Sequence, residues 1–166
     1  MYLKKIADLR IDSDLKQKDV ALFLHVNRST YSKWENGDNN IPLDKLDRLT
    51  MKYEVSFDYV FDNVKAKRIE NCDYFKINLE ILRHNIRLMR KRNGFTQDML
   101  SRKIGVSKST YSRYENGTLL IPIDKFSLLG NIFDISLDVL AGKVKLSKEV
   151  NSDKFMEVWI TGLVIF

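Results

Sequence analysis

The chain contains one nine-residue stretch twice: Ser29-Thr30-Tyr31-Ser32-Lys33-Trp34-Glu35-Asn36-Gly37 and, 80 positions later, Ser109-Thr110-Tyr111-Ser112-Arg113-Tyr114-Glu115-Asn116-Gly117. The same register continues without a gap on both sides, and 17 of the 53 positions between 9–61 and 89–141 are identical. A gapless match of this length indicates an internal repeat. The chain is therefore expected to be two copies of one module.

Each copy has the pattern of five short helices. In the second copy, apolar residues recur at three- and four-residue spacing over 74–92, which predicts the first helix there. Asn93-Gly94 is typical of a helix end. Thr96, Ser107 and Ser136 are typical N-caps of later helices, and Pro122 suits the first turn of a fourth. Because no stretch of either copy alternates as a strand does, the predicted fold class is all-α.

The repeat also predicts the domain organisation. The modules are expected at 1–61 and 83–142, with a basic linker at 62–82 and a tail at 143–166. The linker has few helix breakers and is expected to be helix-rich. The tail ends in the apolar run FMEVWITGLVIF at 155–166. Such an end predicts either packing against a module or a subunit contact that would make a homodimer.

Charge is concentrated in one part of the chain. There are 28 Lys and Arg against 22 Asp and Glu, a net charge of +6. Counted along the sequence, 1–61 and 94–142 are each neutral, whereas 62–93 carries +5 and ends in the cluster 87–92, Arg-Leu-Met-Arg-Lys-Arg. A basic cluster beside neutral modules is typical of nucleic-acid binding, and a solvated helix face with extra lysines explains it equally well.

Other classes of protein find little support in the composition. With Cys72 as the one cysteine and only His25 and His84 as histidines, no disulfide or metal site is expected. No Gly-rich phosphate loop and no nucleophile–base pair is found, so neither an enzyme nor a cofactor is expected. No segment reaches the roughly 18 apolar residues that span a bilayer, and the start lacks an apolar signal region. We expect a soluble cytoplasmic protein that makes no membrane contact.

The second and third predicted helices, joined by a short turn, form a helix-turn-helix arrangement. Thr96-Gln97, the run 106–117, Pro122 and the run 133–140 resemble the Cro/C1-type (XRE-family) DNA-binding domain of phage repressors. The resemblance covers 3–61 and 83–141. It implies two five-helix, lambda-repressor-like domains in tandem. It also implies a transcriptional regulator, a repressor of bacterial or mobile-element origin, that binds double-stranded DNA at a pseudo-palindromic operator.

The resemblance also implies which residues meet DNA, since the third helix of such a module enters the major groove. The base-facing residues would be Lys108, Ser109, Ser112 and Arg113 in the second copy and Arg28, Ser29, Ser32 and Lys33 in the first. Arg and Lys donate to guanine O6 and N7, so both copies are expected to prefer guanine-containing half-sites. Backbone contacts would come from Gln17, Gln97, Asn36, Asn116, Arg90 and Arg92, with a helix C-cap as the alternative role of the two Asn residues.

Other matched residues are assigned to structure. Glu35 and Glu115 each lie 25 residues after an arginine, Arg10 or Arg90. The resemblance implies that this pair joins the first helix to the end of the third. Tyr31, Tyr111, Trp34, Tyr114, Leu24, Ile104, Val26 and Val106 are expected in the cores.

The first copy departs from the family pattern. Lys16 replaces the Thr96 cap, His25 replaces Gly105, and Asp12 and Asp14 lie near the expected phosphate path. We therefore expect the second copy to be the main DNA reader, and the first to read a second half-site weakly or to contact a protein. The chief alternative for the whole chain is a protein-binding antirepressor that uses helix-turn-helix surfaces on a protein partner. A third alternative is RNA binding, but the sequence lacks the aromatic stacking platform that is usual in proteins that bind single strands.

Overall fold

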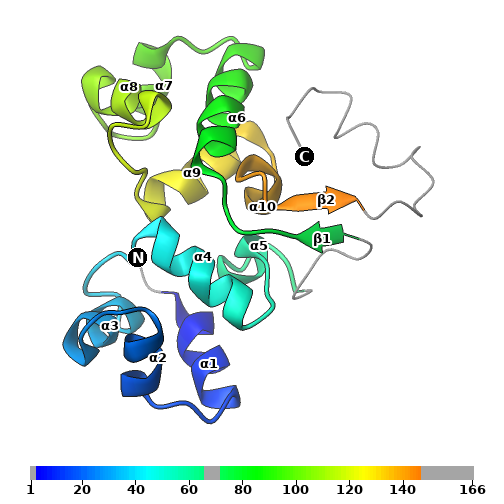
Figure 1. Cartoon of the computed structure of the whole chain (residues 1–166). Helices are drawn as coiled ribbons and strands as arrows, with labels where there is room; N and C mark the ends of the chain where they lie inside the picture. The colour runs from blue at the N-terminus through cyan, green and yellow to red at the C-terminus, as the bar shows by residue number, and fades with distance from the viewer. Residues whose placement is uncertain (1–2, 66–71, 147–166) are drawn as a thin grey trace. The chain divides into compact units, whose positions relative to one another are not determined.

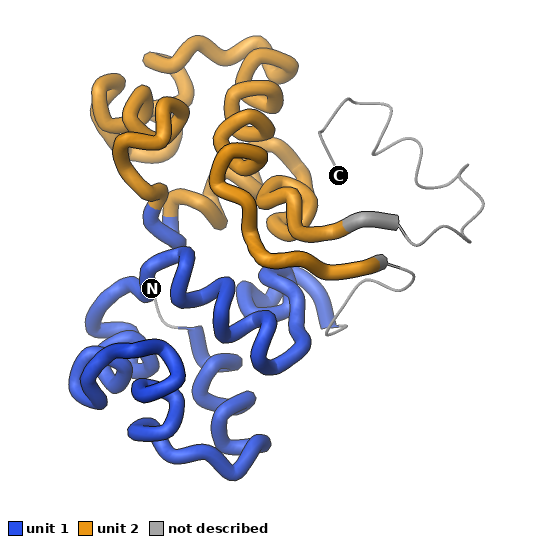
Figure 2. The backbone as a smooth tube through the Cα atoms, in the orientation of Figure 1, with its two compact units in different colours: residues 1–68, 122–124 blue, residues 69–121, 125–166 orange. Residues whose placement is uncertain are grey.

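The computed structural model describes residues 3–65 and 72–146. The chain divides into two compact units, each holding most of one copy of the repeat (Figure 2). Unit 1 comprises 1–68 and 122–124, and unit 2 comprises 69–121 and 125–166. The part of the tail beyond Leu146 lies outside the described residues, and with it the two expectations for the apolar end.

Each copy of the repeat folds into five helices, as the sequence predicts, and the all-α class is confirmed (Figure 1). The first copy contains α1 (Lys4–Asp12), α2 (Gln17–Phe23), α3 (Arg28–Glu35), α4 (Leu43–Lys52) and α5 (Phe57–Val60). The second contains α6 (Leu79–Arg92), α7 (Gln97–Lys103), α8 (Lys108–Asn116), α9 (Ile123–Phe133) and α10 (Leu137–Leu140).

The linker differs from its prediction. Cys72–Tyr74 form strand β1, which pairs antiparallel with β2 (Val144–Leu146) within unit 2. Residues 75–78 are irregular, so α6 begins at Leu79 and not at 74. Asn78 sets this start, because its Oδ1 accepts hydrogen bonds from the backbone N–H groups of Glu80 and Ile81. Of the described linker, only its last residues are helical.

Side-chain caps fix where most of the other helices begin. Thr96 and Ser107 each accept a hydrogen bond from the N–H three residues on, both at 3.1 Å. Lys16 provides no side-chain cap for α2, as its replacement of Thr96 predicts, but the start of the helix is stabilised in another way. The Lys16 N–H donates to Asp19 Oδ2 at 2.9 Å, which is the reciprocal half of a capping box. Helix α2 therefore begins at Gln17, in register with Gln97 of α7.

The two cores are built from matching positions. Tyr31 and Tyr111 are fully buried, as are the pairs Leu24 and Ile104, Leu46 and Phe126, Leu49 and Leu129, and Phe57 and Leu137. Tyr114 is also buried, whereas Trp34, Val26 and Val106 are half-buried. Each core packs against the inner side of the third helix. This packing fixes the orientation of the helix, and with it the direction in which its outer side faces.

The turn after the second helix needs a left-handed residue in both copies. Gly105 has φ +71° and His25, at the matching position, has φ +55°. A Cβ on Gly105 would meet nothing closer than Lys125 Nζ at 3.9 Å, so a side chain there would not clash with its surroundings. The free-energy cost of a side chain at this position therefore comes from the backbone conformation. Positive φ disfavours a residue with a Cβ by roughly 1 kcal/mol.

His25→Gly is therefore expected to stabilise unit 1 by at most about 0.5 kcal/mol, because the greater unfolded-state entropy of glycine offsets half or more of the gain at positive φ. Urea denaturation measures the change. Gly105→His is the matched variant and should destabilise unit 2 by a similar amount. A loss of stability in His25→Gly would contradict the account of this turn.

Candidate nucleic-acid interface

Helix α8 presents one polar stripe to solvent. Its buried side carries Tyr111, Tyr114 and Glu115. The opposite side carries residues at i, i+1, i+4, i+5 and i+8, positions that share one face of a helix. We call them the unit 2 reading stripe: Lys108, Ser109, Ser112, Arg113 and Asn116. Ser112 is half-buried and the other four are exposed.

Helix α3 presents the same arrangement in unit 1. Tyr31 and Glu35 are buried on its inner side. The unit 1 reading stripe consists of Arg28, Ser29, Ser32, Lys33 and Asn36. As in unit 2, the serine in the middle of the stripe, Ser32, is half-buried, and the other four residues are exposed. The structure thus brings together, within each unit, the predicted base-facing residues and one predicted Asn.

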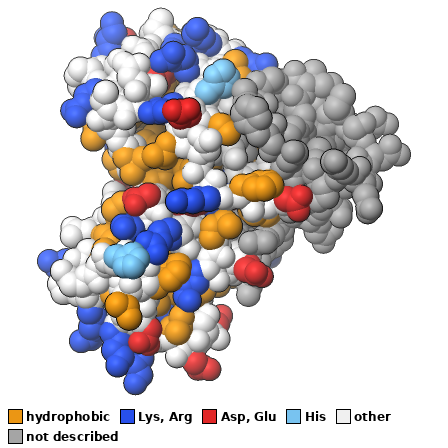
Figure 3. All heavy atoms as spheres, viewed as in Figure 1, with side chains coloured by type: hydrophobic (Ala, Val, Ile, Leu, Met, Phe, Trp, Pro, Cys, Tyr) orange, Lys and Arg blue, Asp and Glu red, His pale blue; other side chains and the backbone are white. Residues whose placement is uncertain are grey.

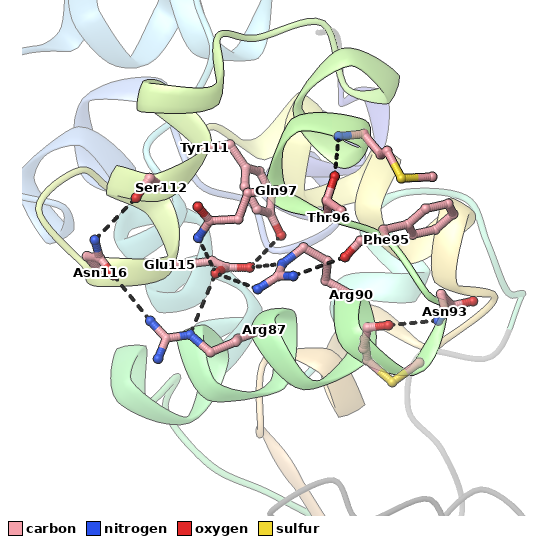
Figure 4. A network of polar contacts seen from close by, with 12 residues as sticks. Arg87, Arg90, Asn93, Phe95, Thr96, Gln97, Tyr111, Ser112, Glu115 and Asn116 are labelled. Carbon is pink, nitrogen blue, oxygen red and sulfur yellow. Dashed lines mark hydrogen bonds and ion pairs between the residues drawn. The ribbon is translucent and has the colours of Figure 1, made fainter.

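The buried carboxylate of Glu115 holds α8 against α6 and α7 (Figure 4). Arg90 donates to it twice, from Nε to Oε1 at 2.6 Å and from Nη2 to Oε2 at 3.2 Å. Gln97 and Tyr111 donate to it at 2.8 and 2.9 Å. The predicted Arg–Glu bridge is confirmed, and it fixes the end of the helix that carries the reading stripe.

The same four-residue cluster recurs in unit 1. Arg10 donates to both oxygens of Glu35 at 2.7 and 3.2 Å, and Gln17 and Tyr31 donate at 2.7 and 3.1 Å. Burial by itself would raise the pKa of Glu35 and of Glu115. The hydrogen bonds from arginine, glutamine and tyrosine outweigh burial and hold both pKa values below the ordinary one. Both carboxylates are therefore ionised at neutral pH.

Three of the predicted backbone contacts have internal partners. Gln97 and Gln17 each use one amide hydrogen on the buried glutamate, a contact that the repeat did not predict. Each amide retains a second hydrogen. Arg90 is 9% exposed, and its remaining Nη1 donates to the Phe95 carbonyl at 3.0 Å. Because the Arg90 guanidinium already donates to Glu115 and to the Phe95 carbonyl, we do not assign it a contact with DNA.

The two Asn residues differ in their surroundings. Asn36 is the C-cap of α3, the alternative role expected for it. Asn116 is the last residue of α8, and Gly117 is the C-cap with φ +74°. Asn116 also accepts a hydrogen bond from Arg87 and donates one to Ser112, two contacts that no feature of the sequence predicts.

A hollow lies beside the start of the third helix in each unit. In unit 1 it is lined by Arg10, Lys16, Gln17, Lys18 and Arg28. In unit 2 it is lined by Arg90, Lys91, Gly94, Phe95, Thr96, Gln97, Asp98 and Lys108. Among the described residues, Lys16, Lys18 and Arg28 form no ion pair, whereas Asp98 of unit 2 pairs with Arg102 at 2.8 Å. The hollow of unit 1 is thus the more cationic of the two.

Exposed cations also cover the end of the first helix of unit 2. Lys91 and Arg92 are both exposed, and no acidic side chain of the described chain pairs with either. The matching residues of unit 1 are Ile11, which is 59% exposed, and Asp12. Figure 3 shows Lys and Arg side chains gathered where α6 ends and α7 begins in unit 2, and near α2 and α3 in unit 1.

Neither a metal cluster nor a membrane span is seen in the ranges 3–65 and 72–146. No three His, Cys, Asp or Glu side chains lie close enough there to hold a metal ion. No described helix is long and apolar enough to cross a membrane.

A comparison with protein-family models supports the geometry. The helix-turn-helix family model matches twice, at residues 6–60 and 86–140, which together make up most of the chain. The chain belongs to the Cro/C1-type helix-turn-helix family. Each match spans one five-helix copy, with the third helix inside it.

Known members of the helix-turn-helix family match at the length of one module. The "Uncharacterized HTH-type transcriptional regulator YobD" of Bacillus subtilis (strain 168) is 37% identical over 57 residues, 34% of this chain and 51% of YobD. The "Cryptic phage CTXphi transcriptional repressor RstR" of Vibrio cholerae is 36% identical over 55 residues, 33% of this chain and 50% of RstR.

A third relative has a name of a different kind. The "Antitoxin PezA" of Streptococcus pneumoniae serotype 4 (strain ATCC BAA-334 / TIGR4) is 32% identical over 66 residues, 40% of this chain and 42% of PezA. The chain thus spans about half or less of the length of these three relatives. No solved structure matches the chain.

Proposed function

We propose that the chain is a sequence-specific regulator of transcription, a repressor, that binds double-stranded DNA with the third helix of each unit in the major groove. The observation that carries the proposal is the outward side of α8. Lys108 and Arg113 lie on this side, and no described acidic side chain neutralises them. The other side of the helix is fixed by the buried ion pair between Arg90 and Glu115. Exposed, unpaired donors on a rigid helix are what base reading requires.

The proposal assigns base contacts to the two reading stripes and backbone contacts to the surrounding cations. Lys108, Ser109, Ser112 and Arg113 would read one half-site, and Arg28, Ser29, Ser32 and Lys33 a second. Phosphates would be met by Lys91 and Arg92 in unit 2, by the cationic hollow in unit 1, and by the second amide hydrogens of Gln17 and Gln97. The Asn residues would contribute from the ends of the stripes.

The two units would contribute unequally. Unit 2 has the additional cations Lys91 and Arg92, where unit 1 has Ile11 and Asp12, so unit 2 is the main reader. The hollow lined by Lys16, Lys18 and Arg28 supports DNA contact by unit 1 as well. Two half-sites bound by one chain would add avidity, because the second contact is intramolecular.

The salt dependence of binding to random-sequence duplex DNA tests this assignment. Eight exposed cations lie on or beside the two stripes, and on a duplex without the preferred sequence those of the stripes are also free to meet phosphates: Lys16, Lys18, Arg28, Lys33, Lys91, Arg92, Lys108 and Arg113. If most of them neutralise phosphates, the log–log slope of affinity against salt should be about −6 or steeper. Lys18→Asp, which copies Asp98, should make the slope shallower by about 1 to 2, since it replaces a cation by an anion.

Lys4→Asp is the matched control for that variant, because it makes the same charge change at the start of α1, away from the predicted contacts. Its slope should equal that of the wild-type chain. A wild-type slope shallower than about −2 would contradict phosphate contact by both units.

A second candidate function, binding of a protein partner through unit 1, is favoured by two exposed apolar residues. Leu22 is 76% exposed and Ile11 59% exposed. Unit 2 carries Arg102 and Lys91 at the matching positions. Exposed apolar side chains where the other copy carries cations fit a protein contact better than a DNA contact. If unit 1 binds a protein in this way, the folded chain should select a single DNA box, the one read by unit 2, with a shallow dependence of affinity on salt.

A further inference from the structure

We propose that Arg87 is a positioning residue that fixes the hydrogen-bonding direction of the Ser112 hydroxyl in the unit 2 reading stripe. The proposal rests on the proposed function, since it gives Ser112 a part in reading a base pair. Two consecutive hydrogen bonds carry it, from Arg87 to Asn116 and from Asn116 to Ser112 (Figure 4).

Arg87 reaches the end of α8 from the neighbouring helix α6. Its Nη2 donates to Asn116 Oδ1 at 3.2 Å, and its Nε lies 3.6 Å from Glu115 Oε2. The Glu115 carboxylate is buried and held by Arg90, so it provides a fixed anchor for the second guanidinium. The Arg87 side chain itself is 48% exposed, at the surface where the reading stripe lies.

This contact decides which way the Asn116 amide points. A guanidinium offers only donors, so it selects the carbonyl end of an amide. With Oδ1 toward Arg87, the Nδ2 group faces Ser112 and donates to its Oγ at 3.3 Å. The reversed amide would place two donors against each other at Arg87. Arg87 therefore sets the orientation of Asn116.

The orientation of Asn116 in turn limits what Ser112 offers to DNA. A serine hydroxyl can donate or accept, and so it contacts either kind of base edge. The Ser112 oxygen already accepts from Asn116, whereas its hydrogen has no acceptor within the described part of the chain. One of the two acceptor lone pairs of the Ser112 hydroxyl is thus occupied, so donation becomes its favoured mode. It would favour base-edge acceptors such as guanine O6 and N7 or thymine O4.

Unit 1 lacks this device and provides an internal comparison. Ser32 and Asn36 occupy the matching positions, but Ala7 stands where unit 2 has Arg87. Within the described residues no hydrogen bond joins the side chains of Asn36 and Ser32. Ser32 therefore keeps both hydrogen-bonding options. The difference would make unit 2 the more selective reader, for a reason separate from net charge.

The spectra of the free full-length protein provide the first test. In Arg87→Ala the side-chain amide signals of Asn116 should shift, and Arg87→Lys, which keeps a cationic donor, should largely restore them. Ala7→Arg is the converse variant and should shift the side-chain amide signals of Asn36. Unchanged Asn116 signals in Arg87→Ala would overturn the proposal, whatever the chain does with DNA.

Base selectivity provides the second test. The base pair read by Ser112 is the one whose preference disappears in Ser112→Ala, measured on single-base variants of a duplex that the wild-type chain selects. At that pair, Arg87→Ala should lower the affinity ratio between preferred and disfavoured bases about two- to tenfold, as expected for one hydrogen bond. Arg87→Lys should recover most of the ratio.

Lys91→Ala controls for the lost charge, because Lys91 lies one turn further along α6 and is also cationic. It should weaken binding to every duplex alike and leave the ratio unchanged. An unchanged ratio in Arg87→Ala, with altered overall affinity, would overturn the positioning role and leave the proposed function standing. A wild-type chain that binds no DNA would overturn the proposed function and the base-reading part, while the spectra still decide whether Arg87 orients Asn116.

Discussion

Replacing Lys108 and Arg113 together by alanine is expected to remove most sequence-specific DNA binding by the chain. Each long cation on a reading stripe can donate to a guanine edge, and a good contact of this kind contributes about 1 to 3 kcal/mol of discrimination. The double variant should therefore lose about thirtyfold or more in affinity for the selected duplex. Fluorescence anisotropy at fixed salt measures the loss.

Both side chains are exposed and without an ionic partner in the described chain, so the stability of the double variant should be close to that of the wild type. Arg102→Ala with Lys103→Ala is the matched control, because it removes two neighbouring cations from α7, outside the stripe. It should change affinity only slightly. The matching unit 1 variant, Arg28→Ala with Lys33→Ala, should have a smaller effect than the unit 2 variant. An equal or larger effect would contradict the ranking of the two units.

Replacing Glu115 by glutamine is expected to destabilise unit 2 by about 3 kcal/mol at neutral pH. The variant leaves the guanidinium of Arg90, 9% exposed, without its charge partner. It also weakens the attachment of α8 to α6 and α7. Urea denaturation at pH 7 measures the change, and Glu35→Gln is the equivalent variant in unit 1. Its effect should be somewhat smaller, because the Arg10 side chain is more exposed than that of Arg90, 15% against 11%.

The effect should also depend on pH in a defined direction. Because the pKa of Glu115 is lowered in the folded state, the ionised carboxylate contributes stability that is fully present above its ordinary value of 4.5. That contribution is lost as the pH falls from there through the folded-state pKa. The wild-type and Glu115→Gln stabilities should therefore converge below pH 4.5. Glu80→Gln is the control, since its side chain is 86% exposed and should change stability little. A constant difference down to pH 3 would contradict the assigned ionisation.

The repeat allows much of this structure to be predicted. A match held over 53 positions carries helix order, caps and core positions from one copy to the other. The resemblance to the Cro/C1-type family implies the bridge between the Arg and the Glu that lie 25 residues apart in both copies. His25 keeps the left-handed turn of Gly105 because the cores on either side of that turn match. The residues of the reading stripes follow from the resemblance, which implies the side chains of the third helix that meet DNA.

Features absent from the repeat could not be predicted in this way. Arg87 has no counterpart in unit 1, and its contact with Asn116 depends on how closely α6 packs on α8. Strands β1 and β2 are three residues each and lie about 70 positions apart, so neither shows a recognisable alternation. The hydrogen bond from the Lys16 N–H to Asp19 at the start of α2 uses an acceptor that unit 2 lacks, since Met99 stands at the matching position.

Selection of bound sequences by the full-length chain from random duplex DNA tests base reading by the two units most directly. We expect a motif of two related, guanine-containing boxes, with the stronger base preference in the box whose selectivity depends on Lys108 and Arg113. If the folded chain enriched no sequence at all, DNA reading by α8 would be contradicted, and the exposed apolar residues of unit 1 would then identify a protein-binding function as the better account.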